Sequence, residues 1–546
     1  MFSMPIPFPR IFSPLTSAAS PLGAARALAL ALLLAALAAP DAAAAAERSR
    51  FFIQEFRVEG VRSVASEEIE ETVYPFLGPE RDADDVELAR LAVEALYRSK
   101  GYQAAFVQVP EQDAADGVIR IVVTEGVVGR VSVRGSRYSS PVGLKQDAPS
   151  LAEGQPLDFT QIARDVARLN QVADRRVTPE FKAGAEPGRI DVDLRVEEAK
   201  PPLHANVELN NRNSANTSAL RLNGGVSYGN LFQRGHTLGL NFQVAPENLD
   251  DAKVFSGYYL LRPAGSDFLT LQLLATKQAS DVSTLGGGAV SGRGDTIGGR
   301  AIFALPGGDA FFQTISAGID FKHLEQDLTA GSSVSSAPID YAVLALSYGA
   351  TWLARSGSTT ELSLSPSLGL RGFGGDEREF DTRRFGASGS FAHLRGELAR
   401  TQKLPSSFEL YVRGQFQLSS QPLVDSEQFS GGGIDTVRGY YESEVSGDDG
   451  AVGTAELRSP SLLAPLGVSS WGEWRVHAFV DAGHLSIQQP LPGQAHRFDL
   501  LGVGFGTRVQ LRKNFTGSID AGWPLLEAGQ TEVGDLRVNF SVGATY

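Results

Sequence analysis

Alternation of apolar and polar residues over about ten positions recurs throughout residues 203–546. Residues 407–418 and 536–546 both follow it, with one continuously apolar face. Such alternation indicates an antiparallel strand. A length of about ten residues matches the tilted strands of membrane barrels, whereas globular strands centre on about five or six residues. At about 21 residues per strand and connection, residues 203–546 give about sixteen strands, an even number as in bacterial barrels.

The alternative is a soluble sandwich, in which the apolar faces of two sheets meet in a core. The N-terminus favours the membrane barrel. Arg10 and Arg26 precede an apolar stretch at residues 27–39, and small residues continue to Ala46. This order is typical of a secretory signal peptide, which we place at residues 1–46. The stretch has about 13 apolar residues, too few for a helix to span a bilayer, which takes about 20.

Composition excludes several classes of function. The chain has no cysteine, so disulfides, thiolate metal sites and cysteine nucleophiles are ruled out. Its net charge of −14 argues against nucleic-acid binding. The seven histidines show no zinc spacing, and no nucleophile elbow or phosphate loop occurs. We therefore expect no enzyme activity, no cofactor and no metal. The Gly-rich stretch 502–506 lies within a strand pattern and is interpreted as a close-packing device.

Residues 51–199 have a different pattern, with two tandem α+β units. A short strand pattern with Val58 and Gly60 recurs 75 residues later with Val133 and Gly135. Each unit then contains one amphipathic helix, for which we expect Asp84 and Asp158 as the N-caps. The pattern predicts domains at residues 51–127 and 128–199, followed by the barrel at residues 203–546. The alternative is a pair of generic α+β modules.

Two motifs in the barrel region carry a resemblance to a known family. The first, "VRGY", lies in a Gly-rich and acidic loop at residues 424–450. The second, "FVDAG", lies on a strand about 40 residues downstream. With the signal peptide, the two repeats and about sixteen strands, the chain resembles the two-partner secretion transporters (TpsB, haemolysin secretion/activation type) of the POTRA-plus-barrel superfamily. The motif residues are Val437, Arg438, Gly439 and Tyr440 in the loop, and Phe479, Asp481 and Gly483 on the strand.

The resemblance implies an all-β transmembrane barrel in the outer membrane of a Gram-negative bacterium, preceded by two periplasmic POTRA-like domains. It implies that the loop folds into a partly wet lumen, where Arg438 pairs with Asp481. The terminal Tyr546 resembles the signal read by the barrel assembly machinery. The expected partners are a secreted, unfolded TpsA-like exoprotein and outer-membrane lipid, without nucleic acid. POTRA edges would bind the exoprotein by β-augmentation.

Other functions are consistent with parts of the sequence. An outer-membrane insertase of the same superfamily shares VRGY and the barrel but usually carries more POTRA repeats. A passive porin or adhesin needs no POTRA-like repeats. The family typically has a plug helix before its first POTRA domain. Only residues 47–50 separate the expected cleavage site from the first strand, so we expect no plug helix here.

Overall fold

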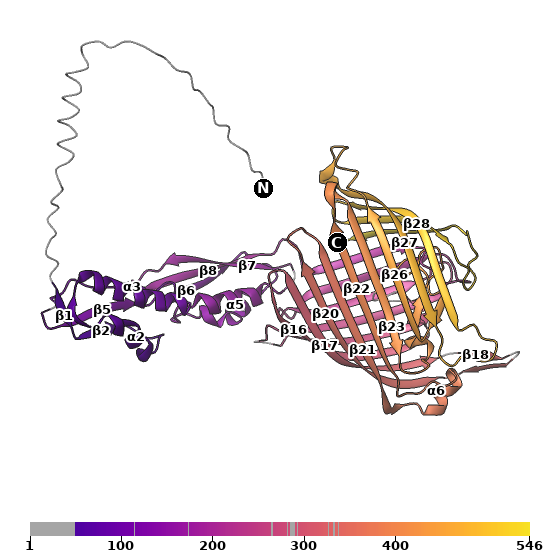
Figure 1. Ribbon diagram of the computed structural model, residues 1–546, viewed down its shortest axis with the longest axis horizontal. Helices are drawn as coiled ribbons and strands as arrows, with labels where there is room; N and C mark the ends of the chain where they lie inside the picture. The colour runs from indigo at the N-terminus through magenta and orange to yellow at the C-terminus, as the bar shows by residue number, and fades with distance from the viewer. Residues whose placement is uncertain are drawn as a thin grey trace, which may run out of the picture. The chain divides into compact units, whose positions relative to one another are not determined.

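The chain divides into two compact units, the first ending at Glu125 and the second comprising Gly126–Tyr546 together with the short segment Gly101–Gln103. Figure 1 shows helices and short strands in the N-terminal part and long, tilted strands in the rest. The expected signal peptide, residues 1–46, lies outside the described residues, as do residues 47–49 that follow it. The computed structural model describes residues 50–113, 115–172, 174–263, 266–280, 282–283, 290–291, 293–325, 327–330, 333–336 and 338–546.

The first unit is an α+β module with a sheet in the order β2-β5-β4, and a separate pairing joins β1 to β3. Its long helix α3 begins after Asp82, whose carboxylate accepts hydrogen bonds from the N–H groups of Asp84 and Asp85. The predicted helix is therefore confirmed, but the predicted cap at Asp84 is wrong, because Asp82 is better placed to accept those bonds. The elements are β1 (Phe51–Ile53), β2 (Glu55–Glu59), α2 (Ser66–Val73), η1 (Tyr74–Phe76), β3 (Gly78–Arg81), α3 (Ala83–Ser99), β4 (Phe106–Gln108) and β5 (Val118–Thr124).

A second α+β module precedes the barrel, with a sheet in the order β6-β8-β7. As in the first module, the outer two strands differ in direction: β6 runs parallel to β8 and β7 antiparallel. Asp158 caps α5 by accepting from the N–H groups of Thr160 and Gln161, as predicted. Among the described residues, no helix has the length and apolar character needed to cross a bilayer. The elements are β6 (Val127–Arg134), α4 (Pro141–Gln146), η2 (Pro149–Leu151), α5 (Phe159–Leu169), β7 (Arg176–Ala183) and β8 (Arg189–Glu197).

A carboxylate closes the same turn in both modules. Glu125 accepts hydrogen bonds of 2.8 Å from the N–H groups of two consecutive residues, 62–63. Glu198 accepts bonds of 2.7 Å from the N–H groups of residues 137–138. Each carboxylate follows the last strand of its sheet and reaches the turn after the first strand. The two modules therefore share a stabilising contact as well as an order of elements.

The glycine of each sequence repeat begins that turn. A Cβ atom on Gly60 would overlap the carbonyl oxygen of Val123, and one on Gly135 would overlap that of Val196. In both modules the first strand thus approaches the last strand so closely that only glycine fits. This shared packing accounts for the repeat seen in the sequence.

The second unit continues into a closed barrel of sixteen antiparallel strands, which confirms the predicted fold class. The connections contain β14 (Val282–Ser283), β15 (Val290–Ser291), β18 (Asp327–Ala330), β19 (Ser333–Ser336), α6 (Glu377–Arg383), η3 (Pro405–Ser407) and η5 (Ser469–Trp471). The wall strands are β9 (Leu203–Asn210), β10 (Arg221–Leu231), β11 (His236–Val244), β12 (Ala252–Leu261), β13 (Leu269–Ser280), β16 (Arg293–Gly308), β17 (Phe311–Glu325), β20 (Ile339–Leu353), β21 (Thr359–Gly374), β22 (Ala392–Lys403), β23 (Glu409–Ser419), β26 (Asp449–Arg458), β27 (Gly472–Ser486), β28 (Arg497–Leu511), β29 (Phe515–Pro524) and β30 (Arg537–Thr545).

The first and last strands of the barrel, β9 and β30, meet in a short ladder. Its pairs run only from Asn206–Thr545 to Asn210–Ser541, fewer than between any other neighbouring wall strands. Beyond the ladder, the Asn211 N–H donates to the carbonyl oxygen of Phe540 at 3.4 Å, and the Asn211 side chain adds two shorter bonds. It donates to the carbonyl oxygen of Val538 at 2.7 Å and accepts from the N–H of Phe540 at 2.8 Å. The seam is therefore closed partly by a side chain.

The two faces of each wall strand differ as the alternation predicted. On β27, Val476 and Val480 are exposed, whereas His477, Phe479 and Asp481 are buried. The exposed apolar side chains form the outer face of the barrel, and the polar side chains point into the lumen. This places Asp481 inside the barrel.

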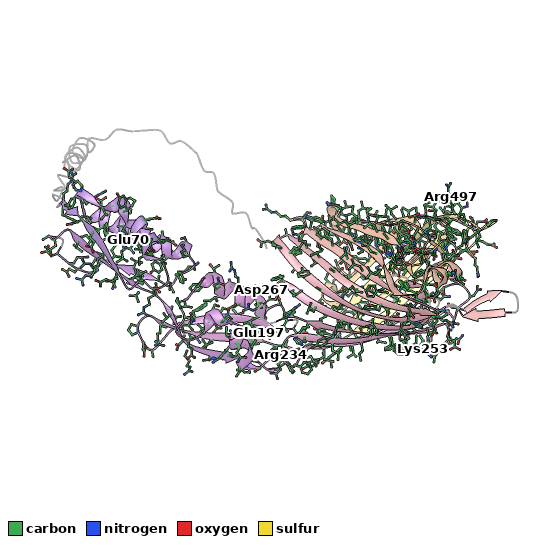
Figure 2. All side chains as sticks on the ribbon, turned by 90° about the horizontal axis from the view of Figure 1, so that it is seen from below. Glu70, Glu197, Arg234, Lys253, Asp267 and Arg497 are labelled. Atoms are coloured by element: carbon green, nitrogen blue, oxygen red, sulfur yellow. The ribbon has the colours of Figure 1, made fainter. Side chains whose placement is uncertain are left out.

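Charged side chains mark the two ends of the barrel (Figure 2). Arg234 and Asp267 lie at the proximal end, which adjoins the second module, and Lys253 and Arg497 lie at the distal end. The strand directions require this, because Arg234 and Asp267 lie in connections on one side and the other two residues begin strands on the opposite side. Every second connection therefore lies at the distal end.

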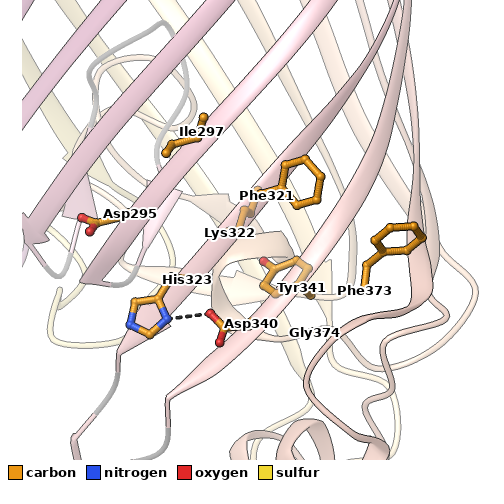
Figure 3. A pocket seen from close by; sticks show the side chains of 9 residues that line it. All are labelled: Asp295, Ile297, Phe321, Lys322, His323, Asp340, Tyr341, Phe373 and Gly374. Atoms are coloured by element: carbon orange, nitrogen blue, oxygen red, sulfur yellow. Dashed lines mark hydrogen bonds and ion pairs between the residues drawn. The ribbon is translucent and has the colours of Figure 1, made fainter.

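A cavity of about 410 Å³ on the outer wall shows where the apolar band ends (Figure 3). Ile297, Phe321 and Phe373 line it with exposed apolar side chains. Toward the distal end the outer face becomes polar, and His323 Nδ1 lies 2.6 Å from Asp340 Oδ1. These side chains stand on the outward face of their strands, so this cavity is separate from the lumen.

Candidate functional site: an inward loop attached to the barrel wall

The distal connection between β23 and β26, residues 420–448, folds into the barrel and is named the inward loop. It begins with η4 (Asp425–Glu427) and contains the hairpin of β24 (Phe429–Gly431) and β25 (Val445–Gly447). The VRGY motif, residues 437–440, lies in the tip between these two strands, and all four residues are buried. Gly439 adopts a φ of +100°, which other residues rarely adopt. The tip can therefore turn sharply against the wall.

Arg438 bonds to two carboxylates of the wall. Its Nε and Nη2 atoms donate to the two carboxylate oxygens of Asp481 at 2.7 and 2.9 Å, the forked geometry that suits arginine. Its Nη1 donates to Glu456 Oε2 at 2.6 Å. The guanidinium carbon lies 3.4 Å from the centre of the Phe479 ring, a cation–π contact. The structure thus brings together the two residues that the motifs suggested.

The burial of this pair differs from the sequence-based expectation. The side chains of Arg438 and Asp481 are 4% and 0% exposed, so the expected partly wet setting is wrong. The reason is that the loop tip itself covers Asp481, and its apolar residues exclude water. Removing one partner from a buried pair leaves an uncompensated charge. The contact can therefore control the position of the loop.

Glu456 on β26 accepts hydrogen bonds from three arginines. Besides the loop arginine, it accepts hydrogen bonds from Arg458 Nε and Arg508 Nη1, both at 2.7 Å. Nearby, His477 Nε2 lies 2.6 Å from Asp520 Oδ1. These residues belong to β26, β27, β28 and β29. The loop tip is thus joined to a charge network that spans four strands.

The other motif residues fit features of the same wall. A Cβ atom on Gly483 would stand 3.1 Å from Cγ2 of Val437, so the glycine provides space for the valine. The Tyr440 hydroxyl donates to the carbonyl oxygen of Leu526 at 2.7 Å and accepts from the N–H of Leu501 at 3.2 Å. The side chains of Val437, Arg438 and Tyr440 therefore each have a specific partner in the wall or in a distal connection.

Wall glycines also admit the loop backbone. The carbonyl oxygen of Arg438 lies where a Cβ atom of Gly502 would stand, and a Cβ atom on Gly522 would lie 2.8 Å from the nitrogen of Gly439. Gly504 similarly leaves space for the Phe479 ring. The interpretation of the Gly-rich stretch on β28 as a close-packing device is confirmed.

A second anchor holds the root of the inward loop. The buried Glu427 accepts hydrogen bonds from Lys322 Nζ at 2.5 Å and from the Tyr341 hydroxyl at 2.6 Å. Its other oxygen lies 3.2 Å from His393 Nε2. These partners come from β17, β20 and β22, on a different part of the wall from the Arg438 network. The loop is therefore held at two separate places.

The tip also contacts the distal connections beside the seam. The N–H of Glu442 donates to the carbonyl oxygen of Asn213, which follows β9. The Thr531 hydroxyl, which precedes β30, donates to Glu444 at 2.9 Å. Bonds from one loop to both flanks of the seam link the loop position to the closure of the barrel.

The sequence-based site residues therefore do not all meet. The motif residues of the loop and of β27 form one site, whereas Tyr546 lies at the proximal end of β30, where its N–H donates to the carbonyl oxygen of Ala205 at 2.8 Å. Sequence reasoning missed Glu456, Asp520 and Glu427. Alternation could have placed Glu456 and Asp520 in the lumen. The sequence does not show, however, at which position along the barrel axis these side chains lie. Within the described residues, no His, Asp and Glu cluster is suited to hold a metal ion.

The chain is similar to curated outer-membrane and heme/hemopexin transporters over most of its length. The curated relatives include the outer membrane transporter CdiB of Dickeya dadantii (strain 3937), 23% identical over 466 residues, which cover 82% of this chain and 78% of that protein. They also include the heme/hemopexin transporter protein HuxB of Haemophilus influenzae (strain ATCC 51907), 21% identical over 402 residues, covering 73% of this chain and 70% of that protein.

Solved structures share the fold. CdiB from Escherichia coli matches with a TM-score of 0.64 at 18% identity, over 97% of this chain and all of that one. BamA from Haemophilus ducreyi lacking POTRA domains 1–3 matches with a TM-score of 0.54 at 15% identity, over 91% of this chain and all of that one. At these identities the likeness shows the fold alone.

Family assignment rests on two further matches. Residues 51–126 match the POTRA domain of ShlB type. Residues 188–509, more than half of the chain, match the haemolysin secretion/activation protein ShlB/FhaC/HecB. The chain belongs to the ShlB/FhaC/HecB family of haemolysin secretion/activation proteins, and it is an outer-membrane two-partner secretion pore with a periplasmic POTRA domain.

Proposed function

We propose that this chain binds one unfolded TpsA-type exoprotein in the periplasm and conducts it through the lumen to the cell surface or medium. The observation that carries this proposal is the inward loop. It occupies the lumen, yet its hairpin forms a sheet separate from the barrel, and side-chain contacts hold the loop, with the ion pairs of Arg438 and Glu427 as polar anchors. Contacts of this kind can be exchanged when the loop moves, while the barrel stays closed.

We assign the individual parts as follows. Residues 1–46 are a signal peptide, residues 51–127 and 128–199 are POTRA domains, and residues 203–546 are the barrel. The shared carboxylate-closed turn supports the second POTRA assignment. The exposed edges of β4 and β7 offer backbone groups to which an extended client can bond regardless of its sequence.

The site residues take corresponding roles in this proposal. Val437, Arg438, Gly439 and Tyr440 form the transport motif of the loop, and Phe479, Asp481 and Gly483 form its receptor on the wall. Tyr546 is read by the barrel assembly machinery during insertion into the outer-membrane lipid. The chain works without a cofactor and without enzymatic chemistry, because folding of the client outside the cell favours net export.

The test is a secretion assay with the chain and a TpsA-type exoprotein expressed together in a strain that lacks other such transporters. We expect the exoprotein in the medium with the full chain and in the periplasm when residues 51–199 are deleted. A heat-dependent gel shift checks that each barrel is folded. Equal secretion with and without residues 51–199 would contradict POTRA-dependent transport.

A further inference from the structure

The two sides of the inward loop differ in their packing. Toward β26–β29 the loop is closely packed, and its apolar cluster leaves no passage; the cluster consists of Val437, Tyr440, Val445, Val452, Leu485 and Leu500. Toward β16–β23 the loop root packs against the wall through Leu423, Val424 and the Glu427 anchor, and a cavity of about 620 Å³ lies between the rest of the loop and the wall. An extended chain that crosses the lumen therefore finds space on one side of the loop.

The wall of this cavity carries small hydroxyl side chains at consecutive inward positions. Ser316 on β17 faces Ser347 on β20, with their hydroxyl oxygens 2.7 Å apart. On β21, residues 363, 365 and 367 are all serines and also line the cavity. A serine hydroxyl is short and can both donate and accept. Such a surface can bond to the backbone of a passing chain without selecting its side chains.

Six charged residues of the cavity form three ion pairs with one another. Arg300 lies 2.7 Å from Asp320, and Arg413 lies 2.9 Å from Glu397. At the loop root, Glu427 bonds to the lysine of β17, as described above. Because the charges within these pairs offset one another, the pairs form no strong electrostatic trap for a charged client segment.

Four buried polar atoms in residues that line the cavity have no hydrogen-bond partner in the protein: Oδ1 of Asp320, Nδ1 of His393, Nε of Arg413 and Oγ1 of Thr436. Asp320 and His393 are only 6% and 5% exposed. Buried polar atoms without a partner are costly, so this place favours an occupant with hydrogen-bonding groups. A polypeptide backbone supplies donors and acceptors at every residue.

We propose that this serine-lined cavity is the passage for the client, which crosses it as an extended polypeptide bound through its main chain. The inference rests on the proposed function, and it adds which wall of the lumen the client follows. The client slides along β17, β20 and β21, while the opposite side of the loop remains attached to β26–β29.

The absence of cysteine from the chain allows a direct test. Single cysteines are introduced as Ser347→Cys and Ser365→Cys in the cavity. Ser256→Cys is the matched control, since Ser256 also points into the lumen, next to the exposed Phe255, but does not line the cavity. The probe is an unfolded peptide of Gly, Ser, Asn and Thr with one central cysteine. At ~3.3 Å per residue, about 30 residues span about 100 Å, enough to thread the barrel.

Purified full-length variants are mixed with the peptide under mild oxidation, and the rate of disulfide formation is measured. We expect cross-linking at both cavity positions to be about tenfold faster than at the control position, because proximity raises the effective concentration. Equal rates, or faster cross-linking at Ser256→Cys, would overturn the inference but not translocation. Absence of cross-linking at all three positions would contradict threading itself, and with it the proposed function.

A bulky side chain provides a second test in cells. Ser365→Trp should fill the passage and lower secretion of a co-expressed exoprotein about tenfold, while a heat-dependent gel shift confirms the folded barrel. Ser256→Trp should secrete normally. Normal secretion by Ser365→Trp would place the client elsewhere in the lumen.

Discussion

The carbonyl oxygen of Arg438 lies in the space that a Cβ atom of Gly502 would fill. Gly502→Ala should therefore displace the loop tip from the wall without altering any charge. We expect lower secretion and a higher resting conductance in lipid bilayers. Gly414→Ala is the matched control, because no heavy atom lies within 4 Å of a Cβ at that wall position. Identical behaviour of the two variants would show that the loop does not need this close approach.

Replacing the two partners of the main ion pair should have unequal effects. Arg438→Ala leaves both Asp481 and Glu456 without their loop partner, whereas Asp481→Ala leaves Arg438 bonded to Glu456. Removing one member of a buried pair costs about 3–5 kcal/mol, so Arg438→Ala should secrete less than Asp481→Ala. Neither change removes a backbone hydrogen bond between barrel strands, so both variants should show the normal heat-dependent gel shift.

The corresponding double variant tests whether these residues act through one contact. It should secrete about as poorly as Arg438→Ala alone, because the contact is already lost. Secretion of the two single variants and the double variant is compared at equal barrel levels. Strictly multiplicative losses would mean that Arg438 and Asp481 act independently.

The root anchor should matter separately from the tip. Glu427→Ala leaves the half-buried Lys322 without its carboxylate partner, so we expect unstable conductance and reduced secretion with a folded barrel. Glu377→Ala, which removes an exposed carboxylate on α6, is the control. Combining Glu427→Ala with Arg438→Ala should add losses, since the two anchors lie on different strands. If the double variant secreted as much as either single variant, the two anchors would act as one cooperative unit.

The second module should lose stability in acid through Glu198. Burial tends to raise the pKa of this carboxyl group, but bonds from the Ser139 hydroxyl and from the N–H groups of residues 137–138 hold it below its ordinary value. A depressed folded pKa means that the contribution is present above the unfolded value of about 4.3 and is lost as pH falls through the folded pKa. Glu198→Gln should lower the free energy of unfolding near pH 7 and weaken its dependence on pH below about 4.3.

This prediction is checked by thermal unfolding of a fragment, residues 51–199, from neutral pH to about pH 3. Glu197→Gln is the control, because Glu197 is an exposed neighbour on the same strand. Equal acid sensitivity of the wild-type fragment and Glu198→Gln would exclude this carboxylate as the source.

The barrel could be predicted from the sequence because side chains alternate between the two faces of a strand. The pattern within one strand therefore shows which residues face lipid and which face the lumen. Applied to β27, the same alternation puts Asp481 on the lumen side, opposite Val480. The pairing of Arg438 with Asp481 came from the family resemblance, since the residues are far apart in the chain. The role of Glu456 could not be predicted, because strand stagger decides which inward residues share a height. The cap of α3 was misplaced because several acidic residues compete at its start.

The bonds from the loop tip to Asn213 and Thr531 imply that the loop docks late during folding. These residues flank the first and last strands, so the tip reaches its final partners only when the C-terminal strand has been made and placed. Contacts between segments so distant in sequence form slowly. Closure of the short β9–β30 ladder and docking of the loop should therefore occur together as the last step of folding. A barrel stalled before that step would have both an open seam and an unblocked lumen.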